Sequence, residues 1–212
     1  MSGRCDGMLQ CPDRSDEDEC NLIKIDKQSY NKAYPPRTAE GRQLSVKVQV
    51  ILVAIHQVNE LDMTFGSELI LSLEWYDERV LFFNLKEKEL TNLIKYETAN
   101  DIWIPPLIFN NSKQNMMVIL DETSDLFVNK RSLAKMTKRS WINEDYFYKG
   151  ADNIFVYRLA YEMTHSCQYN LQRYPFDTQT CQIEVVKYFR FFLSICFFNE
   201  PRAHSDIIVF NI

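Results

Sequence analysis

Apolar and polar residues alternate along much of this 212-residue chain, and this period of two constrains the fold more than any other feature. Between residues 45 and 52, four apolar side chains on one face predict a half-buried strand that becomes fully buried toward its end. The same pattern predicts strands over 65–75 and 155–164. No segment keeps an apolar stripe of helical period, and strands do not alternate with helices. The sequence therefore favours an all-β fold, an immunoglobulin-like antiparallel β-sandwich.

Charge and motif content narrow the classes of function. The net charge is −5, of which residues 1–20 hold −4 (six acids against two arginines), so the chain offers no basic face for nucleic acid. The short basic stretch 130–139 is expected to be a solvated loop. Motifs of common active sites, such as G-x-S-x-G, H-E-x-x-H and the P-loop, do not occur, so no enzyme is expected.

The six cysteines point to a compartment outside the cytosol. There is no C-x-x-C pair and the three histidines are scattered, so structural cysteines are favoured over a zinc site. The sequence contains neither the apolar run of about 7–15 residues that a signal peptide needs nor the roughly 18 residues of a membrane helix. These two findings conflict with the cysteines, and we expect the chain to be incomplete.

The acidic first twenty residues contain three of the cysteines. Their pattern resembles the second half of a class A repeat of the low-density-lipoprotein receptor, a small disulfide-rich module. The resemblance pairs Cys5 with Cys20 and puts Asp6, Asp16 and Glu17 on calcium-ligand positions. The first half of the repeat is absent, so calcium binding is not expected, and no other cofactor is implied. A solvated acidic tail is the alternative interpretation.

The most specific motif lies near the other end of the chain. Cys167 and Cys181 enclose thirteen residues with Tyr-Pro-Phe-Asp at the centre, and a Gln stands two positions before the second Cys. This stretch resembles the signature loop of the Cys-loop (pentameric) ligand-gated ion channels, which implies a Cys167–Cys181 disulfide. A stapled hairpin of a secreted domain is the generic alternative. Closing such a loop contributes about 3 kcal/mol by restricting the unfolded chain.

Three further segments resemble the same family in the same order. They are the pair 59–63 and 75–80, the segment around Trp103 with Pro106 in place of the usual Asp, and the strand region 150–164. The resemblance implies an incomplete extracellular sandwich from an invertebrate-type subunit. It divides the chain into a partial class A repeat (1–20), a linker or lead-in segment (21–44), a partial ligand-binding domain (45–187) and an unrelated tail (188–212).

In this family a small-molecule neurotransmitter binds between homologous subunits of a pentamer. The resemblance places six residues near that ligand: Ile70, Ser72, Arg158 and Ala160 on one face of the subunit, and Phe109 and Asn110 on the other. Arg158 is the candidate partner for a ligand carboxylate, with a solvated surface arginine as the alternative. Asn110 also begins the N-glycosylation sequon Asn-Asn-Ser, and a glycan there would conflict with a ligand contact.

The resemblance also implies residues that couple binding to pore opening. They lie in one turn and at the tip of the Cys-loop: Glu60, Leu61, Asp62, Tyr174, Pro175, Phe176 and Asp177. The full-length parent is expected at the extracellular face of the plasma membrane, reaching the membrane only through a part missing from the C-terminus. The alternatives are a soluble ligand-binding pentamer and a non-functional truncated or splice product. A sandwich without its last strands would expose an edge and aggregate.

Overall fold

The structure is a computed structural model that describes ten stretches of the chain. They are residues 12, 22–37, 44–87, 92–113, 118–119, 125–132, 136–139, 144–174, 176–187 and 206–211. The described chain is almost entirely β-structure, with one four-residue helix, α1 (Tyr96–Ala99), and one short 3-10 turn, Leu171–Arg173. All strand pairs are antiparallel, so the predicted all-β antiparallel fold is confirmed.

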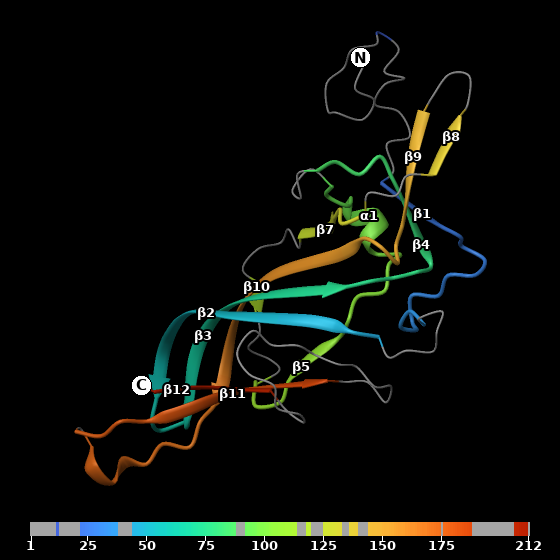
Figure 1. The fold of residues 1–212 in the computed structure, drawn as a ribbon. Helices are drawn as coiled ribbons and strands as arrows, with labels where there is room; N and C mark the ends of the chain where they lie inside the picture. The colour runs from blue at the N-terminus through green and yellow to red at the C-terminus, as the bar shows by residue number, and fades with distance from the viewer. Residues whose placement is uncertain are drawn as a thin grey trace.

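One long sheet forms the first layer of the sandwich (Figure 1). Its order is β2-β3-β10-β6, with β7 also paired to β10. The strands are β2 (Val46–Asn59), β3 (Thr64–Trp75), β10 (Ile154–Ser166), β6 (Val118–Ile119) and β7 (Asp125–Asn129). β3 pairs with β10 along its whole length without a register shift, whereas the β2–β3 ladder has two irregularities.

Two smaller sheets make up the rest of the fold. The first has the order β1-β4-β9-β8, with β1 (Ile23–Ile25), β4 (Val80–Phe83), β9 (Glu144–Lys149) and β8 (Met136–Arg139). The second has the order β12-β11-β5, with β12 (Asp206–Asn211), β11 (Thr180–Lys187) and β5 (Leu107–Phe109). Each of them packs on one end of the long sheet's apolar face, since each shares a core cluster with β3.

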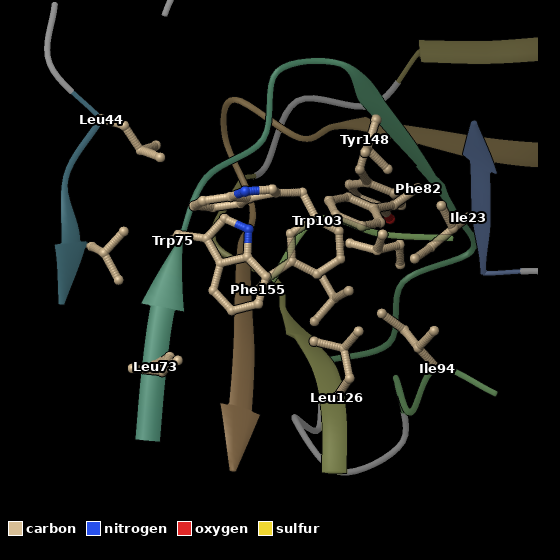
Figure 2. Close-up of a cluster of buried hydrophobic side chains, with 14 of the residues drawn as sticks. Ile23, Leu44, Leu73, Trp75, Phe82, Ile94, Trp103, Leu126, Tyr148 and Phe155 are labelled. Atoms are coloured by element: carbon tan, nitrogen blue, oxygen red, sulfur yellow. The ribbon is translucent and has the colours of Figure 1, made fainter. Parts of the chain in front are cut away.

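Aromatic rings fill the larger of the two clusters (Figure 2). Trp75 is fully buried and stacks on Phe155 at 5.3 Å between ring centroids. Trp103 meets the Trp75 ring edge-on at 6.2 Å, and Phe82 meets Phe155 edge-on at 5.1 Å. Offset and edge-to-face geometries are the favourable ones for aromatic pairs. These rings join the long sheet to β4 and to the segment after α1, and they make both tryptophans core residues.

A buried carboxylate connects the same region by hydrogen bonds. Asp77 is completely buried and accepts from Arg79 through Nε (2.8 Å), Nη2 (2.7 Å) and the backbone N–H (3.1 Å). It also accepts from the Tyr30 hydroxyl at 3.0 Å, and that oxygen in turn accepts from the Trp103 N–H at 2.9 Å. Burial raises the pKa of Tyr30, which keeps its hydroxyl protonated as a donor. Gly150 is required here, because a Cβ on it would lie 2.0 Å from the Asp77 carbonyl oxygen.

Part of the predicted pattern is wrong at the end of the first strand. Sequence analysis predicts full burial beyond residue 50, but Ile51 and Val53 are 46% and 49% exposed. Ile51 lies opposite Ile70 on the outer face of the sheet, and a register shift between Leu52 and Ala54 gives Val53 no partner in the ladder. β2 therefore remains a half-buried strand with an irregularity.

The two flanking segments also contribute strands. Within 21–44, predicted as a linker or lead-in, β1 pairs with β4 and places Ile23 in the core. Within 188–212, β12 pairs with β11 along six register positions and covers the edge that sequence analysis leaves open. The first twenty residues, apart from Pro12, lie outside the described residues, and so do Cys5, Cys20 and the calcium candidates Asp6, Asp16 and Glu17.

Removing the partner of the buried carboxylate should destabilise the fold. Arg79→Ala leaves Asp77 buried and unpaired, which costs about 3 kcal/mol of unfolding free energy. The matched control is Arg131→Ala, because Arg131 is half exposed and pairs with Glu74 only at 3.7 Å; its cost should stay within about 0.5 kcal/mol. Urea unfolding of the three proteins measures both values, and equal losses in the two variants would contradict the central role of Asp77.

Deleting residues 206–212 should expose the edge of β11. An unpaired strand edge promotes intermolecular pairing, so we expect aggregates in size-exclusion chromatography and a melting temperature lower by about 5 °C or more. The complete chain, with this edge covered, should elute as a defined species with a cooperative melt. A deletion variant with an unchanged profile and unchanged melting temperature would show that β12 does not protect the edge.

Candidate functional site

Four of the predicted ligand residues form one patch on the outer face of the long sheet. In the β3–β10 register, Arg158 lies opposite Ser72 and Ala160 lies opposite Ile70. Their side chains point away from the core because the intervening residues, such as Leu71 and Leu159, are buried. Ile70 is 38% exposed and Arg158 is exposed, whereas Ser72 and Ala160 are half-buried. The structure therefore brings these four residues together.

Arg158 has the surroundings of a cation that is free to meet an anion. Its guanidinium carbon lies 4.9 Å from the centroid of the Phe127 ring, a cation–π contact that orients the side chain. Asp125 is its neighbour in the β7–β10 register. Within the part of the chain that the structure describes, however, the guanidinium forms no ion pair.

The other two predicted ligand residues lie in a different sheet and differ from each other. Phe109, on β5, is buried and packs edge-on against His165 at 6.2 Å between centroids. Its ring therefore belongs to the core rather than to an exposed aromatic box. Asn110 is exposed, and its Nδ2 donates to Glu184 Oε2 at 2.8 Å. The sequon and ligand roles predicted for Asn110 both need this exposed side chain.

The disulfide-closed loop between β10 and β11, called the hairpin here, forms one end of the molecule (Figure 1). The two strands that it joins lie in different sheets. Cys167 and Cys181 are bonded, as predicted, and both are buried. Gln179 braces the loop: its Oε1 accepts from the Asn170 N–H at 2.8 Å, and its Nε2 donates to the Asn170 carbonyl at 2.9 Å and to the Asp177 carboxylate. This is the Gln that stands two positions before the second cysteine.

The disulfide hairpin and the β2–β3 turn both expose apolar side chains to solvent at this end of the molecule. Phe176 is 92% exposed and Tyr174 is 64% exposed at the hairpin tip, while Asp177 is half-buried and Pro175 lies outside the described residues. In the β2–β3 turn, Leu61 is 95% exposed. Exposed aromatic and leucine side chains at a tip are typical of a surface that contacts another apolar surface.

Direct hydrogen bonds join the β2–β3 turn to the hairpin. The Asn59 Oδ1 accepts from the backbone N–H groups of Leu61 and Asp62 at 3.0 Å, which fixes the turn. The Cys167 N–H then donates to the Met63 carbonyl at 2.9 Å. The buried Tyr169 hydroxyl donates to the Thr64 carbonyl at 2.8 Å. The two groups of residues predicted to couple binding to gating therefore lie side by side.

Charge also connects the turn and the hairpin. Burial raises the pKa of Tyr169, and the negative charge of Glu60 adds to that effect. Glu60 thus lies close enough to the hairpin for its charge to be felt there. The turn that contains Glu60, Leu61 and Asp62 is therefore a neighbour of the disulfide loop.

The comparison with known proteins agrees with this arrangement. The profile of the neurotransmitter-gated ion-channel ligand binding domain matches residues 21–189. The chain belongs to this family. The match includes the paired strands β3 and β10, the β2–β3 turn and the disulfide-closed hairpin, so the family resemblance seen in the sequence is confirmed.

Relatives of this ligand-binding domain include named receptor subunits. It is 28% identical over 148 residues to the gamma-aminobutyric acid receptor subunit rho-1 of Homo sapiens. It is 25% identical over 148 residues to the theta subunit of Mus musculus and 23% identical over 155 residues to the beta subunit of Lymnaea stagnalis. Each match covers 70% of this chain but only 26%, 20% and 27% of those subunits, respectively.

The structure gives no membrane span or metal centre within the residues it describes. None of the described helices is long and apolar enough to cross a bilayer. Histidine, cysteine and acidic side chains do not gather into a metal-binding group in the same residues.

One buried polar residue of the ligand-binding domain is not among the predicted site residues. His165, two positions before Cys167, is completely buried and stacks on Phe65 at 5.1 Å between centroids. Its Nε2 lies 2.9 Å from the Ser67 hydroxyl, and its Nδ1 has no partner among the described residues. The alternation of β10 contains the signal, since it puts residue 165 on the same inner face as Met163.

Burial lowers the pKa of His165 from 6.5 to about 4. The folded state therefore binds fewer protons at this site than the unfolded state, so its contribution to stability is complete above pH 6.5 and is lost as the pH falls toward 4. We expect His165→Gln to flatten the loss of unfolding free energy over this window, measured by urea unfolding at several pH values. Equal slopes for wild type and His165→Gln would contradict this prediction.

Proposed function

We propose that this chain is the extracellular ligand-binding region of a ligand-gated channel subunit that couples transmitter binding to pore opening. The ligand is a small-molecule neurotransmitter held between homologous subunits of a pentamer. It is bound rather than chemically transformed. The parent protein lies at the extracellular face of the plasma membrane, and its pore lies outside this chain.

One observation carries the proposal: an exposed arginine on the outer face of the sheet without an ion pair among the described residues. Arg158 is oriented by the Phe127 ring and is bordered by Ser72, its partner on β3. A guanidinium matches a carboxylate in bidentate, charge-assisted geometry. We therefore propose that the transmitter is an amino acid whose carboxylate meets Arg158. The relatives are named as gamma-aminobutyric acid receptor subunits, which supports this class.

Ile70, Ser72 and Ala160 complete that face of the site in the proposal. Asn110 and the β5 region belong to the opposite face of the neighbouring subunit. That Phe109 is buried argues for a supporting role behind Asn110 rather than a ligand contact. Two faces in different sheets are what a site between subunits requires, because each subunit offers one face to each neighbour.

The coupling surface is the end with the disulfide hairpin. We propose that Leu61 and Phe176, with Tyr174 and Pro175, contact the membrane part of the receptor. The turn and the hairpin are hydrogen-bonded to each other through Met63 and Thr64, so they move as one unit. Glu60, Asp62 and Asp177 supply the polar contacts of that surface. This is a two-state coupling, in which ligand and pore bias the same element.

The remaining divisions of the chain are part of the same proposal. Residues 1–20 are a partial class A repeat of the low-density-lipoprotein receptor type with a Cys5–Cys20 disulfide. Residues 21–44 lead into the domain, and 45–187 form its body. Residues 188–212 are a tail that differs from the family, and the subunit is of an invertebrate type.

Binding of 4-aminobutanoate to the complete chain tests the ligand proposal. Arg158→Gln should weaken binding about tenfold or more in isothermal titration calorimetry, because it removes a charge-assisted hydrogen bond. Arg158→Lys should restore part of the affinity by keeping the charge. Arg37→Gln, at another exposed arginine, should leave binding unchanged. Equal affinities for wild type and Arg158→Gln, or no binding by wild type, would contradict the proposal.

A further inference from the structure

A hollow of about 630 Å³ is lined by residues of β1 and α1. Figure 1 shows that these two elements lie at the end of the molecule remote from the disulfide hairpin. One wall is β1 with the turn that follows it, and the other wall is α1 with the residue Asp101 just beyond it. Arg158 and the other predicted ligand residues do not line it. The hollow is therefore separate from the site proposed above.

The two walls carry charges of opposite sign. Lys24 and Lys27 line the first wall, and Glu97 and Asp101 line the second. All four side chains belong to exposed residues, and none of them forms an ion pair with another described residue. Lysine and carboxylate side chains thus line one space from its two walls, and the Asp26 carboxylate lies near Lys24 on the first wall.

The hollow is held in shape by contacts on both walls. The Lys32 Nζ donates to the Asn100 carbonyl at 2.8 Å and ties the first wall to the second. The Tyr30 hydroxyl is anchored by its hydrogen bonds to Asp77 and Trp103. On the first wall, Asp26 accepts from the Ser29 hydroxyl at 2.8 Å and fixes the turn that carries Lys27. A site formed before its ligand arrives loses less entropy on binding.

We propose that this hollow binds a small zwitterion with a carboxylate at one end and an ammonium group at the other. Lys24 and Lys27 receive the carboxylate, and Glu97 and Asp101 receive the ammonium group. We choose an extended ω-amino acid as the ligand class, because its two charges are separated by an apolar chain as the lysines and the carboxylates are separated by the hollow. A ligand of one charge alone would meet attraction on one wall and repulsion on the other. The proposal does not depend on the site at Arg158.

Titration of the complete chain with 6-aminohexanoate tests this site. Hexanoate and hexylamine are matched probes, since each carries only one of the two charges. We expect saturable binding of 6-aminohexanoate at low ionic strength, with an affinity at least about fivefold above that of either control. Added salt should weaken this binding, because the charges are exposed.

Variants assign the binding to the two walls. Lys24→Gln with Lys27→Gln, and separately Glu97→Gln with Asp101→Asn, should each lower the affinity for 6-aminohexanoate about fivefold or more. Unchanged melting temperatures would show that these exposed substitutions leave the fold intact. Arg158→Gln should have no effect here, which separates this site from the proposed transmitter site.

Four outcomes would overturn the proposal. They are no saturable binding of 6-aminohexanoate, equal binding of hexanoate, equal binding of hexylamine, and binding that responds to Arg158→Gln but not to the wall variants. The second and third outcomes would identify a simple anion or cation groove. The last would assign the zwitterion to the patch on β3 and β10.

Discussion

The buried Asp77 carboxylate is the interaction on which the upper half of the sandwich depends. A fully buried charge must be paired and hydrogen-bonded, and Asp77 achieves this with Arg79 and Tyr30, which belong to different parts of the chain. Through the Tyr30 hydroxyl the network reaches the Trp103 backbone and so the ring that packs on Trp75. Polar pairing and aromatic packing therefore meet at the same junction between the long sheet and the segments that carry Tyr30 and Trp103.

The two surfaces proposed to be functional lie along one continuous strand pair, β3 and β10. β10 begins beside the aromatic cluster at Phe155, presents Arg158 on its outer face and ends at the residue before Cys167. β3 runs antiparallel beside it and begins next to the turn that carries Leu61. The proposed ligand contact and the proposed coupling surface are thus parts of a single ribbon, which needs no separate connecting element between them.

Sequence reasoning reached the strands and the disulfide because both depend on local signals. Alternation identifies a face, and the spacing of Cys167 and Cys181 with the Tyr-Pro-Phe-Asp centre identifies the loop. Sequence reasoning could not predict that Ile51 and Val53 are exposed, because their exposure depends on how β2 pairs with β3. Nor could it see that β12 covers β11, because pairing between strands that distant leaves no trace in either one alone. His165 was within reach of the alternation, but its unpartnered nitrogen is a property of packing.

The contrast between the two ladders of β3 has a mechanical meaning. Twelve consecutive register pairs join β3 to β10. At the usual rise of an extended strand, this unbroken ladder is about 40 Å long, and it should resist bending. β2 meets the other edge of β3 with breaks at Leu52/Ala54 and His56/Asn59, and Gln57 between the latter two has a positive φ of 53°. Bending of the long sheet should concentrate at these breaks. β2 is then the more deformable strand, and the β3–β10 pair is the stiffer part of the domain.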